Sequence, residues 1–144
     1  MRLWHYKLLP YLPEAQFKGQ LRELVSILRR VKRNGTPNQL LVNLVKNYHE
    51  SDLTGYFMLY DEEYKRRYGK PVADLFKNEF LEYSRGVSDF RPFHGWHNDD
   101  YLRVCMSNLY EKCFFAEGRS KVCEDEWETL LYGYSEITGK EYAL

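Results

Sequence analysis

A run of apolar residues at helical spacing between Glu14 and about Arg33 constrains the fold more than any other feature. The apolar positions in this run are Phe17, Leu21, Leu24, Val25, Leu28 and Val31. They recur every three or four residues, which is typical of the buried stripe of an amphipathic helix. The run ends at Asn34-Gly35, a common helix stop. The sequence therefore predicts one long helix over residues 14–33 that packs on a core.

Helical spacing and capping signals continue along the chain. Residues 36–39 are typical of a capping box, with Thr36 as the N-cap and Gln39 reaching back. Ser51 or Asp52 is expected to cap a third helix, and Asn98 a fifth. The expected helices after the first run from 37 to about 48, from about 52 to 69, over 72–83, from 98 through 113, and, as a last short helix, from about 124.

Val, Ile and Thr are too scattered to build a sheet, so the predicted class is all-α. The chain has 144 residues, which fits one domain. No repeat, linker or low-complexity stretch divides it. We expect a single compact multi-helix domain over residues 1–144, with an aromatic C-terminal tail.

Cysteines and hydropathy bear on the compartment. Cys105, Cys113 and Cys123 are too few and too irregularly spaced for a disulfide framework, and the chain has no C-x-x-C pair. No apolar run approaches the roughly 20 residues that a membrane span needs. We expect a cytoplasmic monomer without membrane contact, metal or organic cofactor.

The charges are unevenly distributed, although the net charge is zero. Residues 1–49 hold nine Lys and Arg against two Glu, and the rest of the chain carries the compensating negative charge. This asymmetry favours one electropositive face that meets phosphates. The alternative is that these charges only solvate helix surfaces.

The predicted first helix has three faces at 100° per residue. The apolar stripe lies on one face, and the opposite face is a basic ridge formed by Lys18, Arg22, Ser26, Arg29 and Arg33. A polar line of Gln16, Gly19, Gln20 and Glu23 lies between them. Glu23 is thus expected to be partly desolvated and able to reach a ligand, and Gly19 to allow close approach of another backbone or a DNA strand. The alternatives are a surface ion pair for Glu23 and a packing contact for Gly19.

Residues 12–24 resemble the first-helix segment of the pyrimidine-dimer DNA glycosylases with associated AP-lyase activity. In that family the catalytic glutamate follows an arginine at this distance from the start, as Glu23 follows Arg22 here. The opening residues 1–5, Met-Arg-Leu-Trp-His, resemble a bacterial branch of the family. Weaker similarity returns at residues 109–112, which end in Lys112, and in the tail around Trp127, Tyr132 and Lys140.

The resemblance implies a DNA repair enzyme whose N-terminal α-amine attacks the sugar C1′, displaces the damaged base and forms a Schiff base, with strand cleavage by β-elimination. An α-amine suits this role because its pKa is about 7.7–8.0, against about 10.4 for lysine. The implied catalytic residues are Met1 and Glu23. The implied DNA-binding residues are Arg2, Arg22, Lys18, Arg29, Arg30, Arg33, Lys112 and Lys140.

The sequence departs from the family at three points. Phage-type members expose a small residue after Met1 is removed, but Arg2 is too bulky for that processing, so the expected nucleophile is the amine of Met1 itself. Ser26 and Asn108 each stand where the family has an arginine. Each lost phosphate contact weakens DNA binding.

Histidines and aromatic residues admit other functions. His94 and His97 could ligate a metal, but the loop is more typical of one packed by Phe93 and Trp96. Aromatic side chains of the C-terminal region are expected mainly in the core, with stacking on bases as the alternative. These residues are Trp127, Tyr132, Tyr134 and Tyr142.

The leading hypothesis is a glycosylase/AP lyase that acts on pyrimidine-dimer or abasic duplex DNA. One alternative is a catalytically inactive nucleic-acid-binding module that uses the basic face from Arg22 to Arg33. Another is a protein-interaction domain whose basic face meets an acidic partner.

Overall fold

The computed structural model describes residues 2–33 and 40–144, and within these ranges all regular structure is helical. The predicted all-α class is confirmed. The elements, in chain order, are the 3₁₀-helix η1 (Tyr6–Tyr11), α1 (Glu14–Val31), α2 (Leu40–Lys46), α3 (Glu50–Tyr68), α4 (Asp74–Tyr83), α5 (Asp99–Phe114) and α6 (Glu124–Thr138). No helix in the described part of the chain is both long and apolar enough to cross a membrane.

Helix α1 follows the predicted pattern closely. Its buried residues include Phe17, Leu24 and Leu28 from the apolar stripe, while Lys18 and Arg22 are exposed on the other side. The helix ends at Val31, two residues before the predicted end. The predicted capping box at 36–39 lies outside the described residues.

The N-terminus of α3 differs from the prediction. His49 is the N-cap, and its Nδ1 accepts a hydrogen bond from the backbone N–H of Ser51 at 3.1 Å. The predicted cap residues Ser51 and Asp52 both lie inside the helix, and Asp52 Oδ2 accepts from the N–H of Phe93 at 2.9 Å. Asp52 is therefore used to hold the distant 84–97 loop, which a local capping pattern does not reveal. The helix ends at Gly69 in the left-handed conformation, as expected.

The second half of the chain matches the prediction in most respects. Asn98 caps α5, because its Oδ1 accepts from the N–H of Tyr101 at 2.9 Å. Phe93 is fully buried in the preceding loop and Trp96 packs against its ring, as predicted. Helix α6 spans 15 residues and is longer than the short helix expected.

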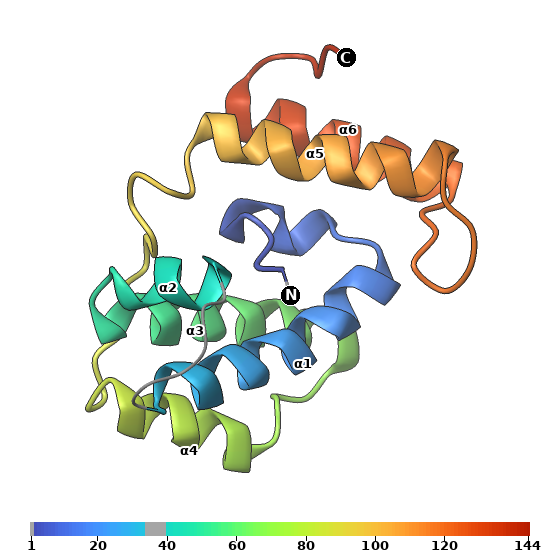
Figure 1. Ribbon diagram of the computed structural model, residues 1–144. Coiled ribbons are helices and arrows are strands. Elements are labelled where there is room, and N and C mark those ends of the chain that lie inside the picture. The colour runs from blue at the N-terminus through green and yellow to red at the C-terminus, as the bar shows by residue number, and fades with distance from the viewer. Residues whose placement is uncertain (1, 34–39) are drawn as a thin grey trace.

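The helices form two layers (Figure 1). Helices α5 and α6 lie side by side in one layer, α1 to α4 form the other, and η1 lies between them. Gly133 of α6 lets η1 approach, since a Cβ there would lie 2.4 Å from a ring carbon of Tyr11. No element was predicted at residues 6–11, where the structure has η1.

Aromatic side chains fill the core between the layers. Phe17 stacks on Tyr60, and Phe57 stacks on Phe80, each with ring centroids 4.3 Å apart. In the C-terminal region, Trp127 and Tyr134 are buried as predicted, Tyr142 is partly buried, and Tyr132 is 61% exposed. The C-terminal tail folds back on α5, where Arg103 donates to the carbonyl of Ala143 at 3.0 Å.

Candidate active site

Residues 2–4 lie along the polar line of α1 and are held there by its side chains. The backbone N–H of Arg2 donates to Glu23 Oε2 at 2.7 Å. Gln20 contacts the segment twice: its Oε1 accepts from the N–H of Trp4 at 2.8 Å, and its Nε2 donates to the carbonyl of Arg2 at 2.9 Å. The side chain of Gln20 thus replaces the neighbouring strand that an extended backbone would otherwise need.

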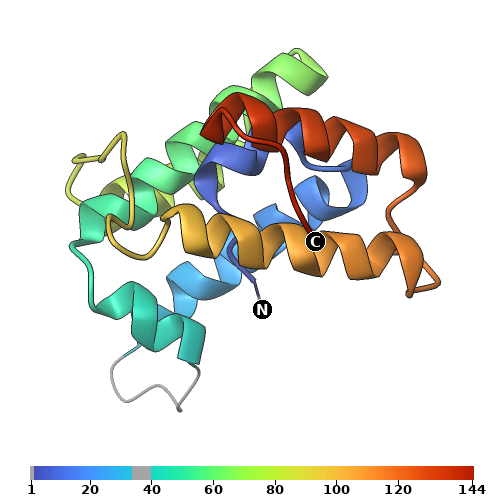
Figure 2. The same cartoon turned by 90° about the horizontal axis from the view of Figure 1, so that it is seen from above.

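Two tyrosines, the fully buried Tyr56 and the partly buried Tyr101, also hold this segment. The hydroxyl of Tyr101 donates to the carbonyl of Leu3 at 2.5 Å, and that of Tyr56 donates to the carbonyl of Trp4 at 2.6 Å. Burial raises the pKa of both hydroxyls above the usual tyrosine value, so both remain protonated donors. The segment is therefore fixed between α1, α3 and α5. Figure 2 shows α5 and α6 side by side when the molecule is seen from above.

Two buried histidines continue this anchoring into η1. The backbone N–H of Tyr6 donates to Nδ1 of His97 at 3.1 Å, and His5 packs beside that ring with centroids 5.1 Å apart. Burial lowers the pKa of His97 to about 2 and, together with Lys7, lowers that of His5 to about 4. Both rings are therefore neutral at physiological pH, and His97 can accept at Nδ1.

A cleft of about 520 Å³ opens beside Arg2 and Glu23. Its walls come from the N-terminal segment, the first turns of α1, the end of α5 and the loop before α6. The cations that line it are Arg2, Lys18, Arg22, Lys112 and Arg119. Glu23 is the one carboxylate among its described lining residues. A cationic cleft with a single carboxylate is suited to bind phosphates around one acid–base group.

The cationic side chains of the cleft differ in how firmly they are held. The Arg2 guanidinium lies over the Trp4 ring, 4.7 Å from its centroid. Lys18 pairs with Glu14 at 3.0 Å, but both side chains are more than 60% exposed, so the pair contributes little to stability. Arg22 is exposed. The Arg2 guanidinium is thus closer to an aromatic ring than the Lys18 ammonium, which is 6.0 Å from the Tyr68 centroid.

The structure brings together some of the predicted site residues and separates others. Those that line the cleft are Arg2, Lys18, Arg22, Glu23 and Lys112. Arg29 and Arg30 lie farther along α1 and Arg33 follows its end. Arg29 Nη2 is 3.4 Å from Glu79 Oε1 of α4. Lys140 follows α6 and is not among the cleft residues. Met1 lies outside the described residues.

Several residues of the cleft and its supports were not predicted as site residues. Arg119 and Ser120 come from the loop between α5 and α6, which carries no local sequence signal. Gln16 and Gln20 stand on the predicted polar line, but their contacts with Ser120 and the N-terminal segment depend on the fold. Tyr56 and Tyr101 also hold the N-terminal segment, and neither was predicted as a site residue.

Comparison with known families agrees with this geometry. The profile of the family described as pyrimidine dimer DNA glycosylase matches residues 1–75, which is more than half of the chain. The chain belongs to the pyrimidine dimer DNA glycosylase family. No curated protein and no solved structure matches it. The matched residues include Arg2, Gln20, Glu23 and Tyr56, whereas Lys112 and Arg119 come from beyond them.

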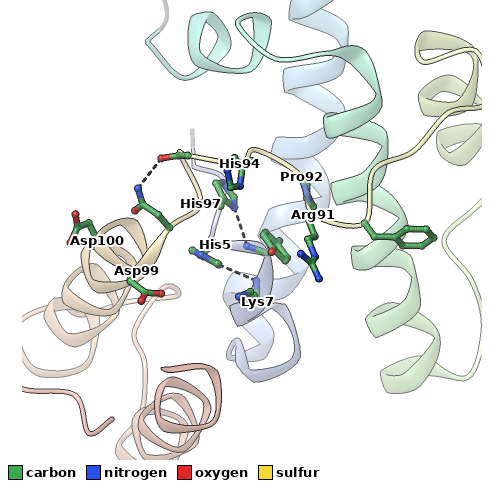
Figure 3. Close-up of a pocket in the computed structure, with 12 residues that line it drawn as sticks. His5, Lys7, Arg91, Pro92, His94, His97, Asp99 and Asp100 are labelled. Atoms are coloured by element: carbon green, nitrogen blue, oxygen red, sulfur yellow. Dashed lines mark hydrogen bonds between the residues drawn. The ribbon is translucent and has the colours of Figure 1, made fainter. Parts of the chain in front are cut away.

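This member of the glycosylase family has a second, larger pocket of about 940 Å³ around η1 and the 84–97 loop (Figure 3). His5, His94 and His97 line this pocket. Nδ1 of His97 accepts the hydrogen bond from the backbone N–H of Tyr6 in η1. Within the described ranges, no group of three or more His, Cys, Asp or Glu side chains is placed to hold a metal ion. His97 binds the backbone of η1, and neither His5 nor His97 is among the residues that line the cleft at Glu23.

Proposed function

We propose that this chain is a DNA glycosylase with AP-lyase activity on pyrimidine-dimer or abasic duplex DNA, and that the α-amine of Met1 is its nucleophile. The observation that carries the proposal is the 2.7 Å hydrogen bond from the Arg2 N–H to Glu23. Three covalent bonds separate an amide nitrogen from the nitrogen of the preceding residue, a span of under about 4 Å. An α-amine directly before Arg2 is thus within reach of the same sugar as Glu23.

The reaction divides into a substitution and an elimination. The neutral amine attacks C1′ of the damaged nucleotide, the bond from C1′ to the base nitrogen breaks, and the base leaves with its electron pair and takes up a proton. The nitrogen loses one of its two protons, and its electron pair then opens the C1′–O4′ bond. O4′ takes up a proton, and a protonated Schiff base that keeps one N–H remains at C1′. Loss of a proton from C2′ then expels the 3′ phosphate and cleaves the strand.

Glu23 serves both stages as a carboxylate. It stabilises the positive charge that develops at C1′ and on the imine nitrogen, and it accepts the proton from C2′. The cations Arg22, Lys112 and Arg119 would bind the flanking phosphates and hold the strand in register. The neighbouring Arg2 favours the neutral form of the amine, because a second positive charge close by is unfavourable.

Borohydride trapping tests the proposal. The wild-type protein, checked by intact mass for retention of Met1, is incubated with abasic duplex and with ultraviolet-damaged duplex in the presence of borohydride. We expect a covalent adduct on both. A variant with one extra residue before Met1 moves the amine by about one residue length, roughly 3.5 Å, and should lose the adduct while it still binds DNA.

An adduct that forms equally well with the extended variant would place the nucleophile elsewhere. If the wild-type protein binds duplex DNA but gives no adduct with either substrate, the glycosylase/AP-lyase proposal is wrong. The remaining function would then be nucleic-acid binding through the basic face of α1.

A further inference from the structure

Gly19 of α1 has no packing role in the described part of the molecule. Two other helical glycines do: a Cβ on Gly55 would lie 1.9 Å from the carbonyl oxygen of Asp89, and one on Gly133 would lie 2.4 Å from the Tyr11 ring. A Cβ on Gly19 would meet, among described atoms, only Nη2 of Arg22 at 3.7 Å, an ordinary contact. The fold explains Gly55 and Gly133 but not Gly19.

Glycine is unfavourable in a helix interior because it loses the most backbone entropy on folding. Gly19 stands in the second turn of α1, inside the helix, and lines the cleft. The bare backbone at this position therefore weakens the helix without a compensating contact inside the protein. This pattern is expected where a ligand, and not a neighbouring helix, needs the space.

Gln16 stands one turn before Gly19 and also lines the cleft. It is 6% exposed, and its Nε2 donates to the carbonyl of Ser120 at 2.7 Å. A carbonyl can only accept, so this bond fixes which side of the amide carries the oxygen. That oxygen, Oε1, is buried and has no hydrogen-bond partner in the described structure. A buried acceptor without a partner is unfavourable, and a donor that binds it would remove that cost. The oxygen is closed off from solvent, so a donor reaches it only when a neighbouring side chain of the cleft moves aside.

We propose that Gln16 and Gly19 form a subsite for the pyrimidine base of the damaged nucleotide. The ring lies against the bare backbone of α1 at Gly19, and its N–H donates to Gln16 Oε1: the N3–H of thymine or the N4 amino group of cytosine. The Arg22 side chain lies over Gly19 and is exposed, so it can turn to a phosphate as the base enters. The subsite deepens the proposed function and rests on it.

The test compares three variants on two substrates. Gly19→Ala should raise Tm by roughly 3 °C, since alanine favours the helix, and should slow nicking of dimer-containing duplex by about tenfold or more. Gln16→Met keeps the length of the side chain but cannot accept; it should slow nicking of the dimer duplex by about tenfold and that of abasic duplex by less than about twofold. The abasic duplex lacks the base, so it isolates the contact.

Asn78→Ala is the matched control, because Asn78 is exposed in α4 and is not among the cleft residues. It should raise Tm without slowing nicking of either duplex. A fall in Tm for Gly19→Ala would show a packing role and overturn the subsite. Equal losses for Gln16→Met on both duplexes would also overturn it, since Gln16 would then act by holding the loop at Ser120.

The outcomes separate the subsite from the function on which it rests. If the wild-type protein traps no adduct with abasic duplex, the proposed function fails and the subsite fails with it. If the wild-type protein is active and Gly19→Ala and Gln16→Met nick the dimer duplex at the same rate, only the subsite is wrong.

Discussion

Two side chains of α1 fix the position of residues 2–4. Gln20 and Glu23 are one turn apart, and each binds a backbone atom of Arg2. Gln20 is 1% exposed, so its amide is removed from water and its two bonds to the segment are not replaced by solvent. Neutral hydrogen bonds from Gln20 therefore hold the segment beside the one from Glu23, and in the proposed function the charge of Glu23 is then available for chemistry.

Glu23→Gln tests that division. The Oε1 of glutamine can still accept from the N–H of Arg2, so the segment should stay in place, but glutamine carries no charge and accepts no proton at neutral pH. We expect nicking of abasic duplex to fall by roughly a hundred to ten thousandfold, while DNA affinity is unchanged or slightly higher. Glu82→Gln, which removes an exposed charge from α4, is the control. Equal nicking by wild type and Glu23→Gln would mean that the catalytic carboxylate is misassigned.

At the scale of elements, α1 has two polar surfaces with different surroundings, the polar line and the basic ridge. Its polar line faces the N-terminal segment and the cleft, and its basic ridge faces solvent. The ridge is not uniform along its length: Lys18 and Arg22 line the cleft, whereas Arg29 lies near Glu79 of α4. We therefore expect the N-terminal half of α1 to contact phosphates next to the reacting sugar.

Arg22→Ala measures the contribution of that half. Because each phosphate contact releases a condensed counterion, the variant should lower the slope of log affinity against log salt by about 0.9. Lys77→Ala, on α4 and outside the cleft, should leave the slope unchanged. The measurement is a titration of undamaged duplex at several salt concentrations. If affinity for Arg22→Ala keeps the wild-type slope, the side chain is only solvated surface.

At the scale of the whole molecule, the cleft joins the two halves of the charge distribution. The positive N-terminal part supplies Arg2, Arg22 and Glu23, and the otherwise acidic remainder supplies Lys112 and Arg119. The N-terminal segment lies between the two layers, so its position depends on both. Anything that loosens the layers should also displace the start of the chain.

Acid should loosen the layers through His5 and His97. Their folded pKa values, about 4 and about 2, lie below the unfolded value of about 6.5. Well above pH 6.5 both histidines are neutral in the folded and in the unfolded chain, so their protonation does not lower the free energy of unfolding. As the pH falls from 6.5 towards 4, the unfolded chain binds protons that the folded chain does not, so stability decreases by up to about 1.4 kcal/mol per pH unit for each histidine.

Urea unfolding at pH 7.5, 6 and 5 measures this decrease. His97→Asn keeps an acceptor for the Tyr6 N–H, since Asn Oδ1 can take the place of Nδ1, but it does not titrate. The variant should show roughly half of the wild-type decrease between pH 6.5 and 5. The pH range lies above the usual carboxyl pKa values, so Asp and Glu contribute little there. An identical decrease in both proteins would contradict the assignment to His97.

Local sequence patterns determined the helices and the faces of α1. Apolar spacing located α1 to within two residues, and Asn98 was predicted as the cap of α5, because both signals depend on residues within a few positions of each other. The same periodicity placed Gln16, Gly19, Gln20 and Glu23 on one line. The expected cap of α3 was wrong because Asp52 instead binds Phe93, 41 residues away.

Only the tertiary structure decided what that line of α1 meets. Tyr56 and Tyr101 hold the segment at residues 2–4, and Tyr101 bonds to Leu3, 98 positions away in the chain. Arg119 lines the cleft from the loop between α5 and α6. Such contacts join single residues that are far apart in the chain, so they leave no periodic or capping signal. The helix faces follow from local geometry, whereas the site arises from the packing of two layers around the first residues of the chain.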